Sequence, residues 1–358
     1  MQFMYIPSTT HVLPLASLQR DRLLSHPGYV VAHEGDRVEA SDVVAKGDAG
    51  RRHVIFDLAR RLGVPPSQAE RYVKKEAGAE VEKGEVLAVR STTLGLGKVT
   101  VRAPAKGTVI GVGEGRLLFA AAGAPVELRA GIPGVISGVK PALGVTIQTT
   151  CALVEGVWGS GKQEYGVLRA VTQDGHEPLT PELVDVSCRG TIMIGGGADE
   201  DALRAAEAIK VRGMILGSMP AALISLTRHL SYPVLVIDRF GPGGMGNEAW
   251  AALVTNNGRE ALIDARPADR WNDQRPEVLI PLPATAAAPS PAHGLPLEPG
   301  RRVRVLRPPY TGAVGSVKQI LPRAQKLPSG VLAVSAQVEI EGQPPIIVPL
   351  ANLEILAS

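Results

Sequence analysis

Apolar runs alternate with helical patterns between residues 184 and 280. Gly190–Ile194, Gly213–Gly217 and Pro233–Ile237 are almost continuously apolar, as strands buried on both faces are. The segments after these runs have the spacing of helices, and a last apolar segment follows them. We expect helices over Asp199–Lys210, Pro220–Leu230 and Asn247–Asn256, and a last strand over Glu260–Ala265. Strands alternating with helices predict a small parallel α/β layer.

The first third of the chain contains an internal repeat. Gly35–Ala45 is echoed by Gly78–Ala88, and in both copies a glycine is followed three residues later by a valine and then by a short apolar strand. His53–Lys75 separates the copies and is predicted to be helical, because Val54, Leu58 and Leu62 recur at helical spacing. Within this insert, Ser67–Glu70 has the form of a capping box for a second helix.

The second copy of the repeat is followed by the strand pattern Ala103–Val109, of the form A-P-x-x-G-x-V. This combination resembles the biotinyl/lipoyl-like barrel-sandwich hybrid fold over Gly28–Phe119. The resemblance implies one domain in which the two copies form the two halves. It also makes Lys98 a candidate carrier lysine, although neither flank of Lys98 has the Asp or Met that lipoyl or biotin ligases read. An ordinary loop lysine is the favoured interpretation.

The end of the chain resembles a KOW-type SH3-like barrel. Gly300–Val305 leads through Tyr310–Val317 to the closing strand pattern of Ile347–Glu354. In the transcription factor NusG and several large-subunit ribosomal proteins, such barrels contact RNA or protein. The candidate partner or nucleic-acid face consists of Arg301, Arg302, Arg304, Arg307, Tyr310, Lys318, Arg323 and Lys326. Because Tyr310 is the only aromatic among them, a base-stacking platform is not expected, and a protein-binding or structural barrel is favoured.

These patterns predict a multidomain protein that combines α/β and all-β parts. The expected order is an N-terminal extension (1–27), a lipoyl-like barrel-sandwich hybrid (28–125) with a helical insert (53–75), a β-rich connecting region (126–183), a small α/β domain (184–280), a Pro/Ala linker (281–299) and the KOW/SH3-like barrel (300–358).

Composition is consistent with this organisation. The 358 residues are too many for one ordinary core, and 40 glycines and 29 prolines with only 4% aromatic residues favour short strands and tight turns. The net charge of +3 implies no strong field over the whole protein. Gly213–Leu226, the longest nearly apolar stretch, is too short to span a membrane. No signal peptide is visible in Met1–Leu24, so we expect a soluble cytoplasmic protein.

Few residues form a recognisable chemical motif. Gly156–Lys162 has P-loop spacing, but Gln163 follows in place of Ser or Thr and the next segment is a predicted strand, so a glycine-rich hairpin is expected. The strand-to-helix turns of the α/β domain are the candidate ligand loops: Gly195, Gly196, Gly197, Gly217, Ser218, Gly241, Gly243 and Gly244. Asp199, Glu200 and Asp201 would repel a phosphate near the first of these loops, which favours a simple turn there.

The remaining residue types point away from metal and redox chemistry. The seven histidines are scattered without metal-ligand spacing, and two cysteines supply neither a disulfide framework nor a four-ligand zinc site. We therefore expect no cofactor and no metal. The leading hypothesis is a non-enzymatic cytoplasmic adaptor, scaffold or assembly protein that binds other proteins or itself. The alternatives are a transcription- or translation-associated factor that contacts nucleic acid through the terminal barrel, and a small-ligand-binding or enzymatic α/β domain.

Overall fold

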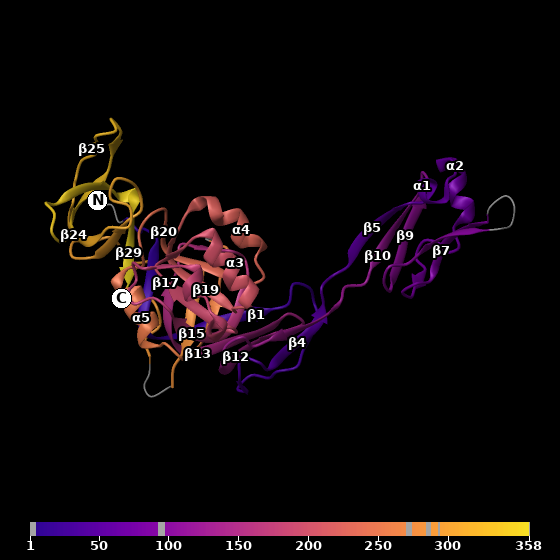
Figure 1. Ribbon diagram of the computed structural model, residues 1–358, viewed down its shortest axis with the longest axis horizontal. Coiled ribbons are helices and arrows are strands. Elements are labelled where there is room, and N and C mark those ends of the chain that lie inside the picture. The colour runs from indigo at the N-terminus through magenta and orange to yellow at the C-terminus, as the bar shows by residue number, and fades with distance from the viewer. Residues whose placement is uncertain (1–4, 92–96, 270–273, 284–287, 293, 358) are drawn as a thin grey trace.

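The computed structural model describes residues 5–91, 97–269, 274–283, 288–292 and 294–357. The protein is mostly β, with one large mixed sheet and several small sheets. Figure 1 shows an elongated molecule in which a central body separates two smaller parts. We call residues 52–121 the distal unit and residues 302–357 the terminal unit. No helix among the described residues is long and apolar enough to cross a membrane.

The α/β part of the body contains four adjacent parallel strands: β15 (Gln163–Ala170), β17 (Thr191–Gly195), β19 (Gly213–Met219) and β20 (Val234–Phe240). Antiparallel strands extend this sheet on both sides: β14 (Trp158–Gly159), β21 (Glu260–Asp264), β22 (Glu277–Pro281) and β13 (Gly144–Glu155). The layer is therefore mixed and not simply parallel. β22 was not expected, and β15 comes from the predicted connecting region.

The helices of this part lie where the sequence predicts them. They are α3 (Glu200–Ile209), the short η4 (Ala221–Leu223) with α4 (Ile224–His229), and α5 (Asn247–Thr255). Asp199 caps α3 by accepting a hydrogen bond from the Ala202 N–H at 2.8 Å, and Lys210 ends it in a left-handed conformation. Short elements complete the region: β16 (Pro178–Leu179), η2 (Pro181–Leu183), η3 (Val186–Cys188) and β18 (Gly197–Ala198).

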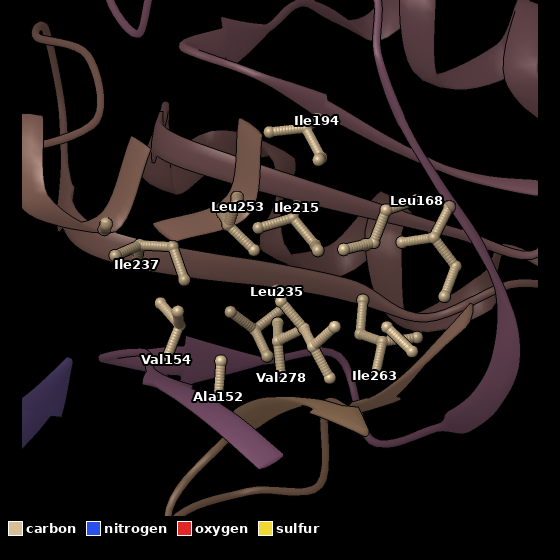
Figure 2. Packing of buried hydrophobic residues seen from close by; sticks show 14 of the residues in the cluster. Ala152, Val154, Leu168, Ile194, Ile215, Leu235, Ile237, Leu253, Ile263 and Val278 are labelled. Carbon is tan, nitrogen blue, oxygen red and sulfur yellow. The ribbon is translucent and has the colours of Figure 1, made fainter. Parts of the chain in front are cut away.

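Two apolar clusters fill the α/β part of the body, one on each face of the parallel strands. In the first, Ile215 and Leu235 pack with Val154 and Val278 from the antiparallel strands, so the sheet curves around this core (Figure 2). α5 closes that cluster through Leu253. The second cluster lies under α3 and α4. Burial on both faces explains why these strands are continuously apolar.

The predicted N-terminal extension is instead the longest strand of the protein. β1 (Thr9–Leu23) pairs antiparallel with β13 and, at Thr9–His11, parallel with β29 (Leu353–Ala357). It thereby joins the body to the terminal unit in one continuous sheet. Pro14 lies where the register with β13 shifts, a position in which its missing N–H is tolerated.

The terminal unit continues this sheet in the order β29-β23-β24-β27-β28. Its elements are β23 (Arg302–Val305), β24 (Val314–Ile320), β25 (Gln325–Lys326), β26 (Leu332–Ala333), β27 (Ser335–Glu339), β28 (Ile346–Pro349) and η5 (Leu350–Asn352). The described parts of the predicted linker are packed and not free: Pro289 O accepts a hydrogen bond from Ser17 N at 2.9 Å, and Leu297 is buried in the core of the terminal unit.

The distal unit has its own core and contains a second copy of the repeat. Its elements are β5 (Arg52–Asp57), α1 (Leu58–Leu62), α2 (Pro66–Ala69), η1 (Glu70–Tyr72), β6 (Glu80–Val81), β7 (Val86–Ser91), β8 (Lys98–Arg102), β9 (Gly107–Gly113) and β10 (Arg116–Ala121). The predicted helical insert is thus wrong at its start, because Val54 belongs to β5. The second helix has no capping box either, since it begins at Pro66 without a side-chain cap.

The first copy of the repeat lies in what we call the proximal unit. It comprises residues 16–23 of β1, β2 (Tyr29–Val30), β3 (Arg37–Val38), β4 (Val43–Asp48), β11 (Pro125–Arg129), β12 (Gly134–Lys140) and the first half of β13. The two units pair their strands in the same register. Val38 faces Gly134 as Val81 faces Gly107, and Asp21 faces Thr146 as Ile55 faces Leu118.

The repeat is therefore present in the structure, but the prediction that its two copies form the halves of one domain was wrong. The copies are not two halves of one barrel, because Val44 and Leu87, which occupy equivalent places, are buried in different cores. Each copy is completed by its own later strands. The distal unit is inserted between β4 and β11 of the proximal unit, where a hydrogen bond from Ala49 N to Ala124 O (3.0 Å) closes its base. Because one unit is inserted into the other, the two copies of the repeat are neighbours in the sequence but lie in different units.

Candidate functional site

The candidate ligand loops of the α/β part come together at the carboxyl ends of the parallel strands. Ser218 N donates to Gly196 O at 2.9 Å, and the Ser218 hydroxyl donates to Gly243 O at 2.5 Å. The loop after β20 is also fixed, since Met245 N donates to Gly175 O at 2.6 Å. The sequence thus identified segments that meet in space at one edge of the sheet.

The glycines of these loops allow backbone to pack directly on backbone. A Cβ added at Gly217 would lie 2.1 Å from Met245 N, and one added at Gly244 would lie 2.3 Å from Gly175 O. Gly196 is similarly close to Gly175, at 2.4 Å from its carbonyl oxygen. These glycines therefore allow the backbone of one loop to pack directly on the backbone of the next.

Asp238, at the end of β20, connects the α/β part to the terminal unit. Its carboxylate pairs with the Arg304 guanidinium of β23 and also accepts from Gly246 N at 2.7 Å. Arg304 Nε donates to Glu354 Oε1 at 2.5 Å, and Thr10 donates to the other oxygen of Glu354 at 3.0 Å. Strands from both ends of the chain thus meet in a buried charge network.

This network overturns part of the predicted partner face. Arg304 is only 3% exposed, so it is not available to phosphate or to a protein partner. Arg302 is exposed but pairs with Glu248, and Arg301 lies 3.9 Å from Glu298. The other four cations, and Tyr310 at 36% exposure, lie on the surface of the terminal unit: Arg307, Lys318, Arg323 and Lys326. Burial along β23 does not alternate between exposed and buried residues, because the Arg304 side chain points inward. Its acidic partners are distant in sequence and could not be recognised from the local pattern.

The structure shows where the candidate carrier lysine, Lys98, and the lysine of the P-loop-like segment, Lys162, lie. Lys98 begins β8 opposite Ser91 and is exposed, while the tip of that hairpin, residues 92–96, lies outside the described residues. Lys162 follows Gly161 and donates to Arg228 O at 2.9 Å, and the next residue opens β15. A strand directly follows Lys162, as predicted, and no P-loop helix begins there. The predicted hairpin is wrong, because β14 pairs with β20 whereas β15 pairs with β17 and β21.

Both cysteines are free and buried. Burial, with the negative charge of Glu277 nearby, raises the pKa of the Cys151 thiol to about 12. We therefore expect Ellman's reagent at pH 8 to leave the native protein unmodified and to titrate both thiols only after unfolding in urea. Rapid reaction of one thiol in the native protein would contradict this assignment. Among the described residues no cluster of His, Cys, Asp and Glu is arranged to hold a metal ion.

Sequence reasoning missed an apolar surface on the distal unit. Ile55 on β5 is 65% exposed, and its cross-strand neighbour Leu118 is partly exposed beside it. At the equivalent places of the proximal unit, Asp21 accepts a hydrogen bond from Thr146 at 2.7 Å and pairs with Lys140. Only the register of the two units reveals this contrast, because neither position is conspicuous along the chain.

The distal unit also differs from the remainder of the chain in charge. Residues 52–121 contain twelve Lys and Arg against seven Asp and Glu, a net charge of +5, whereas the whole chain carries +3. The rest of the protein is therefore slightly acidic. Two of the lysines are paired, Lys75 with Glu85 and Lys106 with Glu82.

Comparison with known proteins assigns the chain to no family. No protein-family model matches the sequence, and no curated protein matches it significantly.

Proposed function

We propose that this protein is a non-enzymatic adaptor that holds a protein partner on the outer face of its distal unit. One observation carries the proposal. The same strand arrangement is built twice in one chain, and it places Asp21 and Thr146 where the distal unit exposes Ile55 and Leu118. Folding of this unit does not require an apolar residue at that position, so the exposed isoleucine is better explained by binding.

We further infer the domain types that serve this function. The proximal and distal units are two barrel-sandwich hybrids of the biotinyl/lipoyl-like type, one nested in the other, and the terminal unit is a KOW-type SH3-like barrel. Support comes from the repeated glycine and valine positions, the shared strand register, and the five-stranded antiparallel order of the terminal unit. In this arrangement the distal unit is the head, and the sheet that β1 completes is the rigid support.

The shape and charge of the head fit this role. Two short connections, between β4 and β5 and between β10 and β11, join the distal unit to the body (Figure 1). Its net charge of +5 favours a partner whose surface is acidic around an apolar centre. Exposed cations on the terminal unit, such as Lys318 and Arg323, favour nucleic acid as the second candidate partner.

Ile55→Asp is the substitution that tests the head. Aspartate is compatible with this position because Asp21 occupies its equivalent, so we expect the melting temperature to change little. Partner binding is expected to fall at least about tenfold, because burial of an isoleucine contributes roughly 1.5–3 kcal/mol. The measurement is quantitative co-purification with the tagged full chain from its native cells, with and without nuclease.

The matched control is Val186→Asp, which changes a valine that is 79% exposed on the body. A protein that is retained by the control, lost with Ile55→Asp and unaffected by nuclease supports the adaptor. Equal recovery with both variants would refute the proposed face. Loss of the partner on nuclease treatment, with a steep fall in binding as salt rises, would favour the nucleic-acid alternative. Mass spectrometry of the protein from its native cells tests whether Lys98 carries biotin or lipoate. A peptide with unmodified Lys98 would exclude the carrier alternative.

A further inference from the structure

We propose that a cavity between the end of β20 and the terminal unit binds a small organic anion through its phosphate or carboxylate group. The cavity measures about 560 Å³ and lies beside the Asp238–Arg304 ion pair. It is lined by Arg239 and Phe240 from β20 and by Arg307 and Thr311 from the segment after β23. Ligands of α/β proteins commonly bind at this carboxyl edge of parallel strands.

Two buried polar atoms of the lining residues lack partners. Arg239 Nε and the Thr311 hydroxyl oxygen are shielded from solvent, and no hydrogen-bond partner for either lies among the described residues. Arg239 itself is fixed, because its Nη1 donates to Thr311 O at 2.8 Å. Buried polar atoms nearly always have a partner. An oxyanion in the cavity would accept hydrogen bonds from both groups.

The charges that line the cavity favour an anion. Asp238 is already paired with Arg304, which Glu354 also neutralises. Among the described residues neither Arg239 nor Arg307 forms an ion pair with an acid, so the three arginines at the cavity exceed the two carboxylates of Asp238 and Glu354. Guanidinium groups stay protonated at all physiological pH values, and their planar forks match the oxygens of carboxylate and phosphate.

Two glycines shape the wall around Arg239. A Cβ on Gly312 would lie 2.4 Å from the Arg239 Cζ, and one on Gly243 would lie 3.1 Å from its Nε. Both residues have positive φ angles, +79° and +138°, so other residue types would be strained there as well as crowded. The glycines thus leave room for the guanidinium, and its hydrogen bond to Thr311 O holds it in place before any ligand arrives.

The size and the apolar part of the lining indicate that the anion carries an organic group. A volume of about 560 Å³ lies within the range of small-molecule sites and far exceeds what one phosphate group fills. Val157, Phe240 and Pro308 line the cavity with apolar surface. The organic group would contact this apolar surface, while the oxyanion would bind the guanidinium groups and the Thr311 hydroxyl.

The test measures binding of inorganic phosphate and, separately, of acetate to the full chain by thermal shift, with sodium chloride at matched ionic strength as the salt control. We expect one of these anions to raise the melting temperature more than sodium chloride does. Arg307→Gln should weaken that binding at least about tenfold, because it removes a charged donor. Arg189→Gln, which removes another exposed arginine distant in sequence from the cavity, should bind like the wild type.

Thr311→Val separates binding from folding. It removes a buried hydroxyl that has no partner among the described residues, so without anion the variant should melt at the same temperature as the wild type or higher. Its anion binding should nevertheless fall about fivefold. The more effective anion identifies the oxyanion class. If neither anion stabilises the protein more than sodium chloride, or if Arg307→Gln and Thr311→Val bind like the wild type, the cavity is not an anion site and the buried atoms are hydrated by water.

Discussion

Replacing Arg304 with methionine is expected to lower the free energy of unfolding by about 3–5 kcal/mol. The substitution leaves the carboxylates of Glu354 and Asp238 at a buried junction without their guanidinium partner. Among the described residues, Glu354 would keep the Thr10 hydroxyl at 3.0 Å and the more distant Arg275 at 3.9 Å. Because β23, β29 and the end of β20 meet there, we expect the terminal unit to separate from the body first. Urea unfolding followed by circular dichroism measures the effect.

Arg302→Ala is the matched control, two residues away on the same strand. Its partner Glu248 is exposed, so the pair contributes at most about 1 kcal/mol. If both substitutions changed stability equally little, the buried network would not hold the terminal unit in place. The comparison also separates two roles that the sequence pattern assigned alike, since one arginine of β23 is structural and the other lies at the surface.

Gly217→Ala is expected to destabilise the protein by about 3 kcal/mol, at the upper end of the range for overpacking. The new methyl group would meet the Met245 backbone nitrogen at 2.1 Å and cannot be accommodated by moving a side chain. Either β19 or the loop before α5 would have to shift, together with the hydrogen bond from Ser218 to Gly243. Equilibrium unfolding in urea would report the loss.

The control for this prediction is Gly197→Ala, in a neighbouring loop of the same edge. Its nearest neighbour, Ser218 O, is 3.4 Å from the added carbon, which is an ordinary contact. We expect a change within about 1 kcal/mol, because alanine also restricts the unfolded chain. A Gly217→Ala protein as stable as this control would show that the loops are not packed as tightly as described.

Local signals account for what was predicted well. The helix α3 has its acidic cap and left-handed end within one short segment, and the strands β17, β19 and β20 are apolar on both faces. These features depend on neighbours a few residues apart, so they are visible in the chain. The glycine loops were correctly expected at one edge of the sheet, because parallel strands bring their carboxyl ends together. The direct packing of these loops on one another could not be recognised from the sequence.

The repeat shows the limit of such reasoning. Its two copies were recognised from glycine and valine spacing, yet each copy forms pairs with later strands that the pattern does not specify. Across the inserted distal unit, Val38 pairs with Gly134 and β4 pairs with β11, and these pairings separate the two copies. The apolar face at Ile55 emerged from the same comparison of registers.

The sequence by itself determined the mostly β character with its α/β segment, the ends of the helices in that segment, and the existence of the repeat, because backbone preference and periodic burial act over short distances. Tertiary structure alone decided that β1 joins the body to the terminal unit, that one unit is nested in the other, and that Arg304 is buried. It also placed Arg239, Arg307 and Thr311 around one cavity. Pairing and charge burial depend on residues far apart in the chain, such as Thr10 and Glu354, whose contact exists only in the folded protein.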